Sequence, residues 1–241
     1  MAVSIDTVYQ RVLALANKEQ RGYITPQEFN LFANQAQLEI FDEYFQDVRL
    51  LGRIPGNNDE YSDTLNVLNE KIGMFEEEHD SVWMLANMPL SGSSNITIPD
   101  EIYKIGQVRV KSQPVELLNS KDYDASKLSA LTAPTFNRPI GRITSRGLEV
   151  SVSATEEWTP VDGSMTISII VRPTTVNWGY VIVNDKPLHN ANTSVSFELH
   201  GSEETELVYK ILKLAGINLK DNELAGNAQN LEVYNKQQEK K

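Results

Sequence analysis

The sequence predicts an α+β protein with an N-terminal helical bundle, a central antiparallel β-sheet or sandwich, and C-terminal helices. Three observations predict it. Helical periodicity and helix caps dominate residues 1–80, short β-type runs fill residues 81–200, and helical periodicity returns in residues 201–241. Because helices and strands are segregated along the chain, this order favours α+β over a doubly wound fold. We therefore expect three regions with these boundaries.

The N-terminal region begins with two capped helices. Ser4 or Asp6 can cap the first. Thr25 caps the second, Pro26 occupies its first position, and Glu28 completes a capping box. A third helix follows the loop "GRIPGNND" and is predicted by one apolar stripe at spacings of four and three, made of Tyr61, Leu65, Leu68, Ile72 and Phe75.

The second helix is apolar on two sides. At about 100° per residue, one face holds Phe29, Phe32, Ala33, Ala36, Ile40 and Tyr44. The nearly opposite face holds Leu31, Leu38, Phe41, Phe45 and Val48. Two interpretations remain open: its own neighbours cover both sides, or one side meets another subunit, since large exposed apolar patches are rare on monomers. The subunit-interface candidates are Phe29, Phe32, Ile40, Phe41, Tyr44 and Phe45.

The middle region carries short runs with β character, separated by turn-forming residues. These runs are "NITIP", "IGQVRV", "GLEVSVS", "MTISIIV" and "SVSFEL". "SKDYDASKLSAL" predicts a short helix or an ordered loop among them. "RPTTVNWGY", residues 172–180, predicts a structured loop at a packing surface.

The C-terminal region predicts one strong helix and one weak helix. Ser202 caps the strong one, and Gly216 fits the position after its end. The weak one is expected from Asp221 to about Lys236 with only a few apolar residues, chiefly Leu224, Leu231 and Tyr234. It is either a loosely attached tail or an arm that docks on a partner, since helix-in-groove binding needs few anchors.

No catalytic or cofactor motif occurs, so we expect neither an enzyme nor a bound cofactor or metal. The acidic run "FEEEHD", residues 75–80, reads as a solvated helix end. Trp83, Trp158 and Trp178 are core or interface anchors, or a sugar-binding platform.

The composition limits the classes of protein further. The 241 residues carry a net charge of −11 and no cysteine, which excludes disulfides and argues against broad phosphate-backbone binding. No run is apolar and long enough to span a membrane, and no secretory signal is expected. Three basic residues, Arg138, Arg142 and Arg146, are candidates for contact with an acidic neighbouring subunit.

Two segments resemble one family. Residues 4–45, "SIDTVYQRVLALANKEQRGYITPQEFNLFANQAQLEIFDEYF", resemble the opening of virion structural proteins in crAss-like and related short-tailed phages of Bacteroidota. "RPTTVNWGY" and residues 196–232 resemble the end of the same family. The middle of the chain is less distinctive.

This resemblance implies a ring or adaptor protein of the tail or head-to-tail connector. About 12 copies would form a dodecameric ring, with portal protein and neighbouring tail rings as partners and residues 25–51 packing the ring. The arm at residues 220–241 would reach the portal. DNA would pass through the channel during ejection without specific binding, in a virion protein made in the cytoplasm of the bacterial host.

The acidic balance fits this role, because a wall that repels phosphate does not trap a moving genome. An alternative function from the residues alone is a β-sandwich binding module, for glycan or protein, in a virion or surface assembly.

Overall fold

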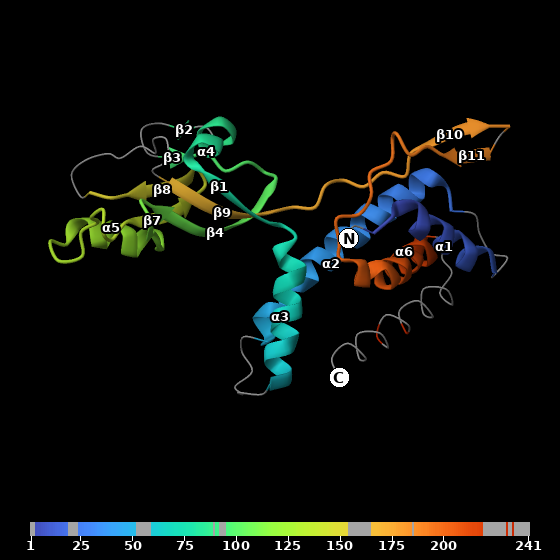
Figure 1. Cartoon of the computed structure of the whole chain (residues 1–241), viewed down its shortest axis with the longest axis horizontal. Coiled ribbons are helices and arrows are strands. Elements are labelled where there is room, and N and C mark those ends of the chain that lie inside the picture. The colour runs from blue at the N-terminus through green and yellow to red at the C-terminus, as the bar shows by residue number, and fades with distance from the viewer. Residues whose placement is uncertain are drawn as a thin grey trace. The chain divides into compact units, whose positions relative to one another are not determined.

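The structure, a computed structural model, describes residues 3–18, 24–51, 59–88, 90–91, 95–153, 165–184 and 186–218, with Asn230 and Val233. The α+β class is confirmed: helices lie at the N-terminus, sheets in the middle, and a helix follows them (Figure 1). The chain divides into two compact units. The helical unit comprises Met1–Met74 and Pro173–Lys241, and the sheet unit comprises Phe75–Arg172.

These units differ from the three expected regions at two places. Residues 75–80 belong to the sheet unit because they form a strand, and residues 173–200 belong to the helical unit because they pack on its long helix. The sheet unit is therefore an insertion within the helical unit. The two ends of the insertion are neighbours, since the amide of Val171, one residue before its end, donates a hydrogen bond to the Phe75 carbonyl at 2.9 Å.

The helical unit is built around one long helix. Its elements are α1 (Ile5–Lys18), α2 (Pro26–Leu51), α3 (Asp59–Gly73), the strands β10 (Tyr180–Val183) and β11 (Lys186–His189), the 3₁₀ turn η1 (Gly201–Glu203) and α6 (Glu204–Asn218). Helix α2 contacts both α3 and α6, and α1 contacts α6. In the stripe predicted for α3, Leu68 and the following Phe75 are buried, whereas the side chain of Tyr61 lies outside the described residues.

The predicted capping box of α2 is confirmed. The Glu28 amide donates to the Thr25 hydroxyl at 3.3 Å, and the Thr25 amide donates to the Glu28 carboxylate at 3.0 Å. These bonds satisfy two backbone donors at the helix start. They also hold the pKa of Glu28 below its ordinary value, chiefly through the backbone hydrogen bond from Thr25. At α1, the Ser4 hydroxyl accepts the Thr7 amide at 3.5 Å.

An extended segment, residues 174–178, lies along α2 and is held by side-chain amides. The Asn34 amide group donates to the Val176 carbonyl and accepts its N–H, both at 2.9 Å. One helical turn earlier, the Asn30 side-chain oxygen accepts the Trp178 N–H at 2.8 Å. Each asparagine thus offers the backbone the bonds that a neighbouring strand would offer.

The same pattern continues one turn later along α2. The buried Gln37 donates to the Thr174 carbonyl at 2.8 Å, and its oxygen accepts the Glu198 N–H at 3.4 Å. Helix positions 30, 34 and 37 span about 10 Å and meet alternate residues of an extended chain that span about 13 Å. We call this set of contacts, made by Asn30, Asn34 and Gln37, the amide ladder.

A buried ionic cluster joins α6 to the other helices. The Lys210 ammonium, whose side chain is almost fully buried, lies 2.7 Å from the Glu43 carboxylate on α2 and 3.7 Å from Glu206. Lys71 of α3 pairs with the buried Glu203 at 2.5 Å. Because a buried charge is costly unless it is paired, these contacts fix the position of α6 relative to α2 and α3.

The sheet unit contains two sheets and two short helices. One sheet has the order β1–β9–β4–β5, and the other has the order β2–β3–β8–β7–β6. Neighbouring strands are antiparallel except for the parallel pair β6–β7. The first sheet comprises β1 (Glu76–Asp80), β4 (Ile102–Val110), β5 (Gln113–Pro114) and β9 (Met165–Val171). The second comprises β2 (Leu90–Ser91), β3 (Asn95–Ile96), β6 (Glu116–Leu117), β7 (Ile140–Thr144) and β8 (Gly147–Ser151), and the helices are α4 (Ser81–Asn87) and α5 (Ser120–Leu128).

Both sheets contribute to one hydrophobic core, as in a sandwich. Strand β9 buries Met165, Ile167 and Ile169 on alternate positions, which is the alternation expected of a half-buried strand. Strands β4, β3 and β8 and helix α4 contribute the facing side chains of this cluster. Of the two alternatives expected within residues 120–131, a short helix or an ordered loop, the structure shows the helix, α5.

Three local expectations are wrong. Residues 76–80 form the strand β1 and not a helix end. Among the described strands β1 pairs with β9 alone, at the edge of its sheet, and its acidic side chains are exposed. "SVSFEL" forms no continuous strand, because Val195 and Phe197 make only single bridges. Helix α6 runs to Asn218, so Gly216 lies inside its last turn, where it is buried.

The weak C-terminal helix falls almost entirely outside the described residues, although Asn230 and Val233 are helical and exposed. None of the helices in the described part of the chain has the length and apolar character that crossing a membrane requires.

The amide ladder predicts a large effect of one asparagine. Replacing Asn34→Leu leaves the N–H and C=O of the buried Val176 without partners, so the free energy of unfolding should fall by about 2–4 kcal/mol. Urea unfolding measures this. Gln35→Leu, on the exposed side of the same helix, is the control, and an equal loss in both variants would contradict the role of the ladder.

The capping box predicts a pH dependence with a definite sign. Because the pKa of Glu28 is lower in the folded state, its contribution to stability is present above the ordinary pKa of a glutamate and is lost as pH falls through the folded value. The difference in melting temperature between wild type and Glu28→Gln should therefore shrink on acidification. A difference that is constant with pH would show that the carboxylate charge plays no part.

Candidate functional site

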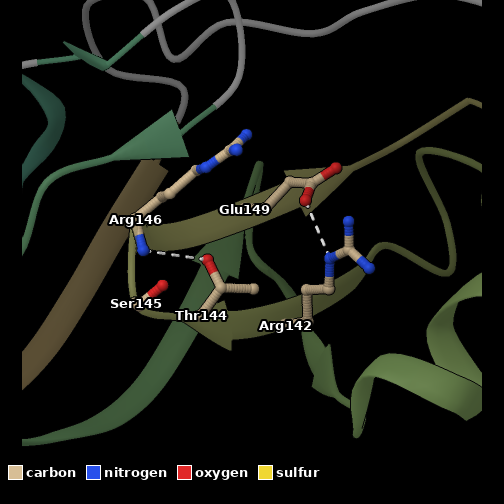
Figure 2. Close-up of a pocket in the computed structure, with 5 residues that line it drawn as sticks. All are labelled: Arg142, Thr144, Ser145, Arg146 and Glu149. Carbon is tan, nitrogen blue, oxygen red and sulfur yellow. Dashed lines mark hydrogen bonds and ion pairs between the residues drawn. The ribbon is translucent and has the colours of Figure 1, made fainter.

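The three basic candidates have different environments. Arg142, on β7, donates to Glu149 at 2.8 Å and to Asp124 of α5 at 3.0 Å, as Figure 2 shows for the first of these contacts. Its guanidinium also lies 4.6 Å from the centre of the Tyr123 ring. The buried Tyr123 donates its hydroxyl to Glu149 at 3.1 Å, and burial raises the pKa of that hydroxyl. Arg142 therefore joins α5 to the sheet, and its charge is already matched.

Arg138 and Arg146 are more accessible. Arg138 pairs with Glu116 at 3.2 Å, with both side chains about half exposed. Arg146 follows β7 in the turn to β8, and its guanidinium has no ion-pair partner among the described residues. It lines an open, polar pocket with Arg142, Thr144, Ser145 and Glu149 (Figure 2). One free guanidinium beside a carboxylate can make a surface contact with an acidic group, but it offers no catalytic arrangement.

The turn that carries Arg146 depends on a glycine. Gly147 has a φ of 126°, and a Cβ there would lie 2.0 Å from the Ile96 carbonyl oxygen on β3. Only glycine fits this approach, which fixes the β7–β8 turn against its neighbouring strand.

The interface candidates on α2 divide into core and surface. Phe29, Ile40, Phe41 and Tyr44 are buried within the chain itself, so they belong to its core and offer no surface to a second copy. Phe32 and Phe45 are only partly exposed. The prediction that these four buried residues contact another subunit is therefore corrected. Helices α1, α3 and α6 of the same chain cover this side of α2.

A different set of α2 residues faces solvent. Leu31 is 71% exposed and Leu38 is 47% exposed, and Asp42 is exposed one turn further on. We call Leu31, Leu38 and Asp42 the outer stripe. The sequence analysis placed both leucines on a face that needed cover but did not choose them as contact residues.

The hairpin β10–β11 carries a second exposed apolar surface, which the sequence analysis missed. Val181 pairs with Leu188, and Val183 pairs with Lys186, so these four side chains share one face. Val183 is 46% exposed, Val181 50% and Leu188 54%. We call this the open face. The signal in the sequence was the run "YVIV" before Asn184, whose positive φ of 50° is typical of a hairpin turn.

The opposite face of the hairpin is anchored by Trp178. The Tyr180 and His189 rings stack on the Trp178 ring at centroid distances of 5.8 and 5.7 Å. Trp178 itself is buried, packs against Tyr9 at 4.1 Å, and donates its indole N–H to Asp6 at 3.0 Å. It is therefore a core anchor with no face free for a sugar. The structured loop expected at residues 172–180 does pack on the helical unit, through the amide ladder.

The other candidates predicted from the sequence make local contacts or lie outside the described residues. Trp83 stacks on His79 at 3.5 Å, and His79 contacts Glu77 at 2.8 Å. Among the residues that the structure describes, no group of three potential ligands is placed to hold a metal ion. Trp158 and the arm candidates Leu224, Leu231 and Tyr234 lie outside the described residues.

The described surfaces are thus suited to contact with protein, through apolar patches with charges at their borders. No protein-family model matches the chain, and no curated protein matches its sequence.

The contacts of Arg142 predict that it supports the sheet unit. Arg142→Met removes the 2.8 Å ion pair of the largely buried Glu149 and leaves it with the more distant Lys127 at 3.8 Å, so the sheet unit should lose about 2 kcal/mol of stability in urea unfolding followed by circular dichroism. Arg146→Met is the matched control and should change stability by less than about 0.5 kcal/mol. Equal effects of the two substitutions would mean that the Arg142 contacts contribute nothing.

Proposed function

We propose that this chain is a structural subunit of a phage virion that forms a ring in the head-to-tail connector or upper tail. In this role it joins the portal protein to neighbouring tail rings and lines the channel for DNA ejection. The observation that carries the proposal is that the helical unit exposes two different apolar surfaces, the open face of the hairpin and the outer stripe of α2.

Two different surfaces on one subunit are what a cyclic ring needs. In a ring each copy contacts its neighbours head to tail, so one surface of each copy meets a different surface of the next. A dimer with two-fold symmetry would need only one self-complementary surface. Grouped exposed apolar side chains, here three on the open face of the hairpin and two on α2, are a usual sign of such contacts.

The resemblance to virion proteins of short-tailed phages supports the same role. The segments that carry it, residues 4–45, 172–180 and 196–232, fall almost wholly in the helical unit, where both surfaces also lie. The unit that contains the resembling segments is therefore also the unit that exposes the open face and the outer stripe.

The charge of the chain supports the proposed lining of a DNA channel. The chain carries a net charge of −11, and the edge strand β1 exposes Glu76, Glu77, Glu78 and Asp80. Acidic surfaces repel the phosphate backbone, so DNA can pass such a wall without binding to it. The sheet unit also exposes Leu128 and Leu131 almost completely, which provides an apolar site for contact with a neighbouring tail protein.

The experiment is to produce the full chain alone and together with the portal protein of the same genome, and to examine both by mass photometry and negative-stain electron microscopy. We expect closed rings of about 12 copies, alone or on the portal. A chain that stays monomeric at high concentration and in the presence of the portal would refute the proposal.

A further inference from the structure

The open face of the hairpin and the outer stripe of α2 carry the same order of chemical groups. On the hairpin, the pair Val181 and Leu188 is followed, toward the turn, by the pair Val183 and Lys186. On α2, Leu31 and Leu38 are followed by Asp42. The hairpin face is apolar up to its charge, whereas on α2 the exposed Gln35 lies between the two leucines; each surface ends in one charge, and the two charges are opposite.

Both surfaces are exposed in the described part of the chain. Lys186 and Asp42 are both exposed, and neither has an ion-pair partner among the described residues. A two-stranded hairpin is marginally stable by itself, and here the Tyr180–His189 end of one face stacks on Trp178 while Ile182, on the same face, is 66% exposed. Covering the open face would add to the packing of the hairpin.

The spacings of the two surfaces agree. Leu38 and Asp42 are one turn apart, about 6 Å along the helix axis. Leu188 and Lys186 are two residues apart on β11, about 7 Å along the strand. A helix laid along the hairpin can therefore set Leu38 against the pair Val181 and Leu188 while Lys186 reaches Asp42.

We infer that the open face of the hairpin packs on the outer stripe of α2 of a second copy of this chain, with Lys186 beside Asp42. This inference rests on the proposed ring function and specifies the contact between neighbouring subunits. The charges are complementary, and both surfaces belong to every copy, so one repeated contact covers both of them on each subunit.

The amide ladder gives this contact a fixed geometry. Asn30 and Asn34 of α2 hold residues 176–178, and Trp178 in turn holds the hairpin, so the two surfaces have a set orientation within one subunit. A constant orientation gives the same transformation from copy to copy, and this transformation closes a ring when it is a pure rotation by a whole fraction of a full turn.

The test uses the absence of native cysteine in the chain. Full-length Leu38→Cys is mixed with full-length Val181→Cys under mild oxidation, and disulfide-linked heterodimers are measured on non-reducing gels. The matched control pairs Val181→Cys with Gln10→Cys, an exposed position on α1. Circular dichroism confirms that each variant is folded, and the same samples are imaged for rings with the portal.

We expect at least about fivefold more heterodimer for the Leu38 pair than for the Gln10 pair, because oxidation traps only neighbouring thiols. Rings without this excess would overturn the inference while the proposed function stands. Excess homodimers of Val181→Cys alone would overturn it in favour of a symmetric hairpin–hairpin contact. Absence of both rings and heterodimers would overturn the inference and the proposed function together.

A charge exchange tests the contact without cysteine. Lys186→Glu and Asp42→Lys should each weaken subunit association by about two- to fivefold, the range for a surface ion pair, and their combination should restore it. Assembly is followed by mass photometry against protein concentration. Losses that add in the double variant, with no restoration, would show that the two side chains do not meet.

Discussion

The structure of the helical unit depends on the amide ladder between α2 and residues 174–178. An extended chain segment packed on a helix normally lacks partners for its backbone, since the helix uses its own N–H and C=O groups internally. Here side-chain amides supply those partners, and Asn34 does so with both its donor and its acceptor. The ladder positions Trp178, and Trp178 positions the hairpin that carries one of the two proposed contact surfaces.

Local signals in the sequence predicted much of the fold. The capping box of Thr25 and Glu28 and the alternation of residues 165–171 involve only neighbours in sequence, and the structure contains both. Strand β1 was missed because its assignment depends on pairing with β9, about 90 residues later, while its own residues are those of an exposed acidic run. The amide ladder is equally non-local: Asn34 contacts a residue 142 positions away.

The candidate site was predicted less well than the fold. The second apolar face predicted on α2 included both Leu31 and Phe41, which differ by about 80° around the helix axis. The boundary between core and solvent falls inside that face, so Phe41 is buried while Leu31 is exposed. Hydrophobicity alone cannot locate such a boundary, because it depends on where α1, α3 and α6 pack.

The connections of the sheet unit have a consequence for how such a protein can change. Phe75 and Val171 are hydrogen-bonded neighbours, so the chain leaves the helical unit and returns to it at almost one point. An insertion with adjoining ends can be lengthened, exchanged or lost with little effect on the core that hosts it. Natural selection can therefore remodel the sheet unit while the fold of the helical unit stays the same.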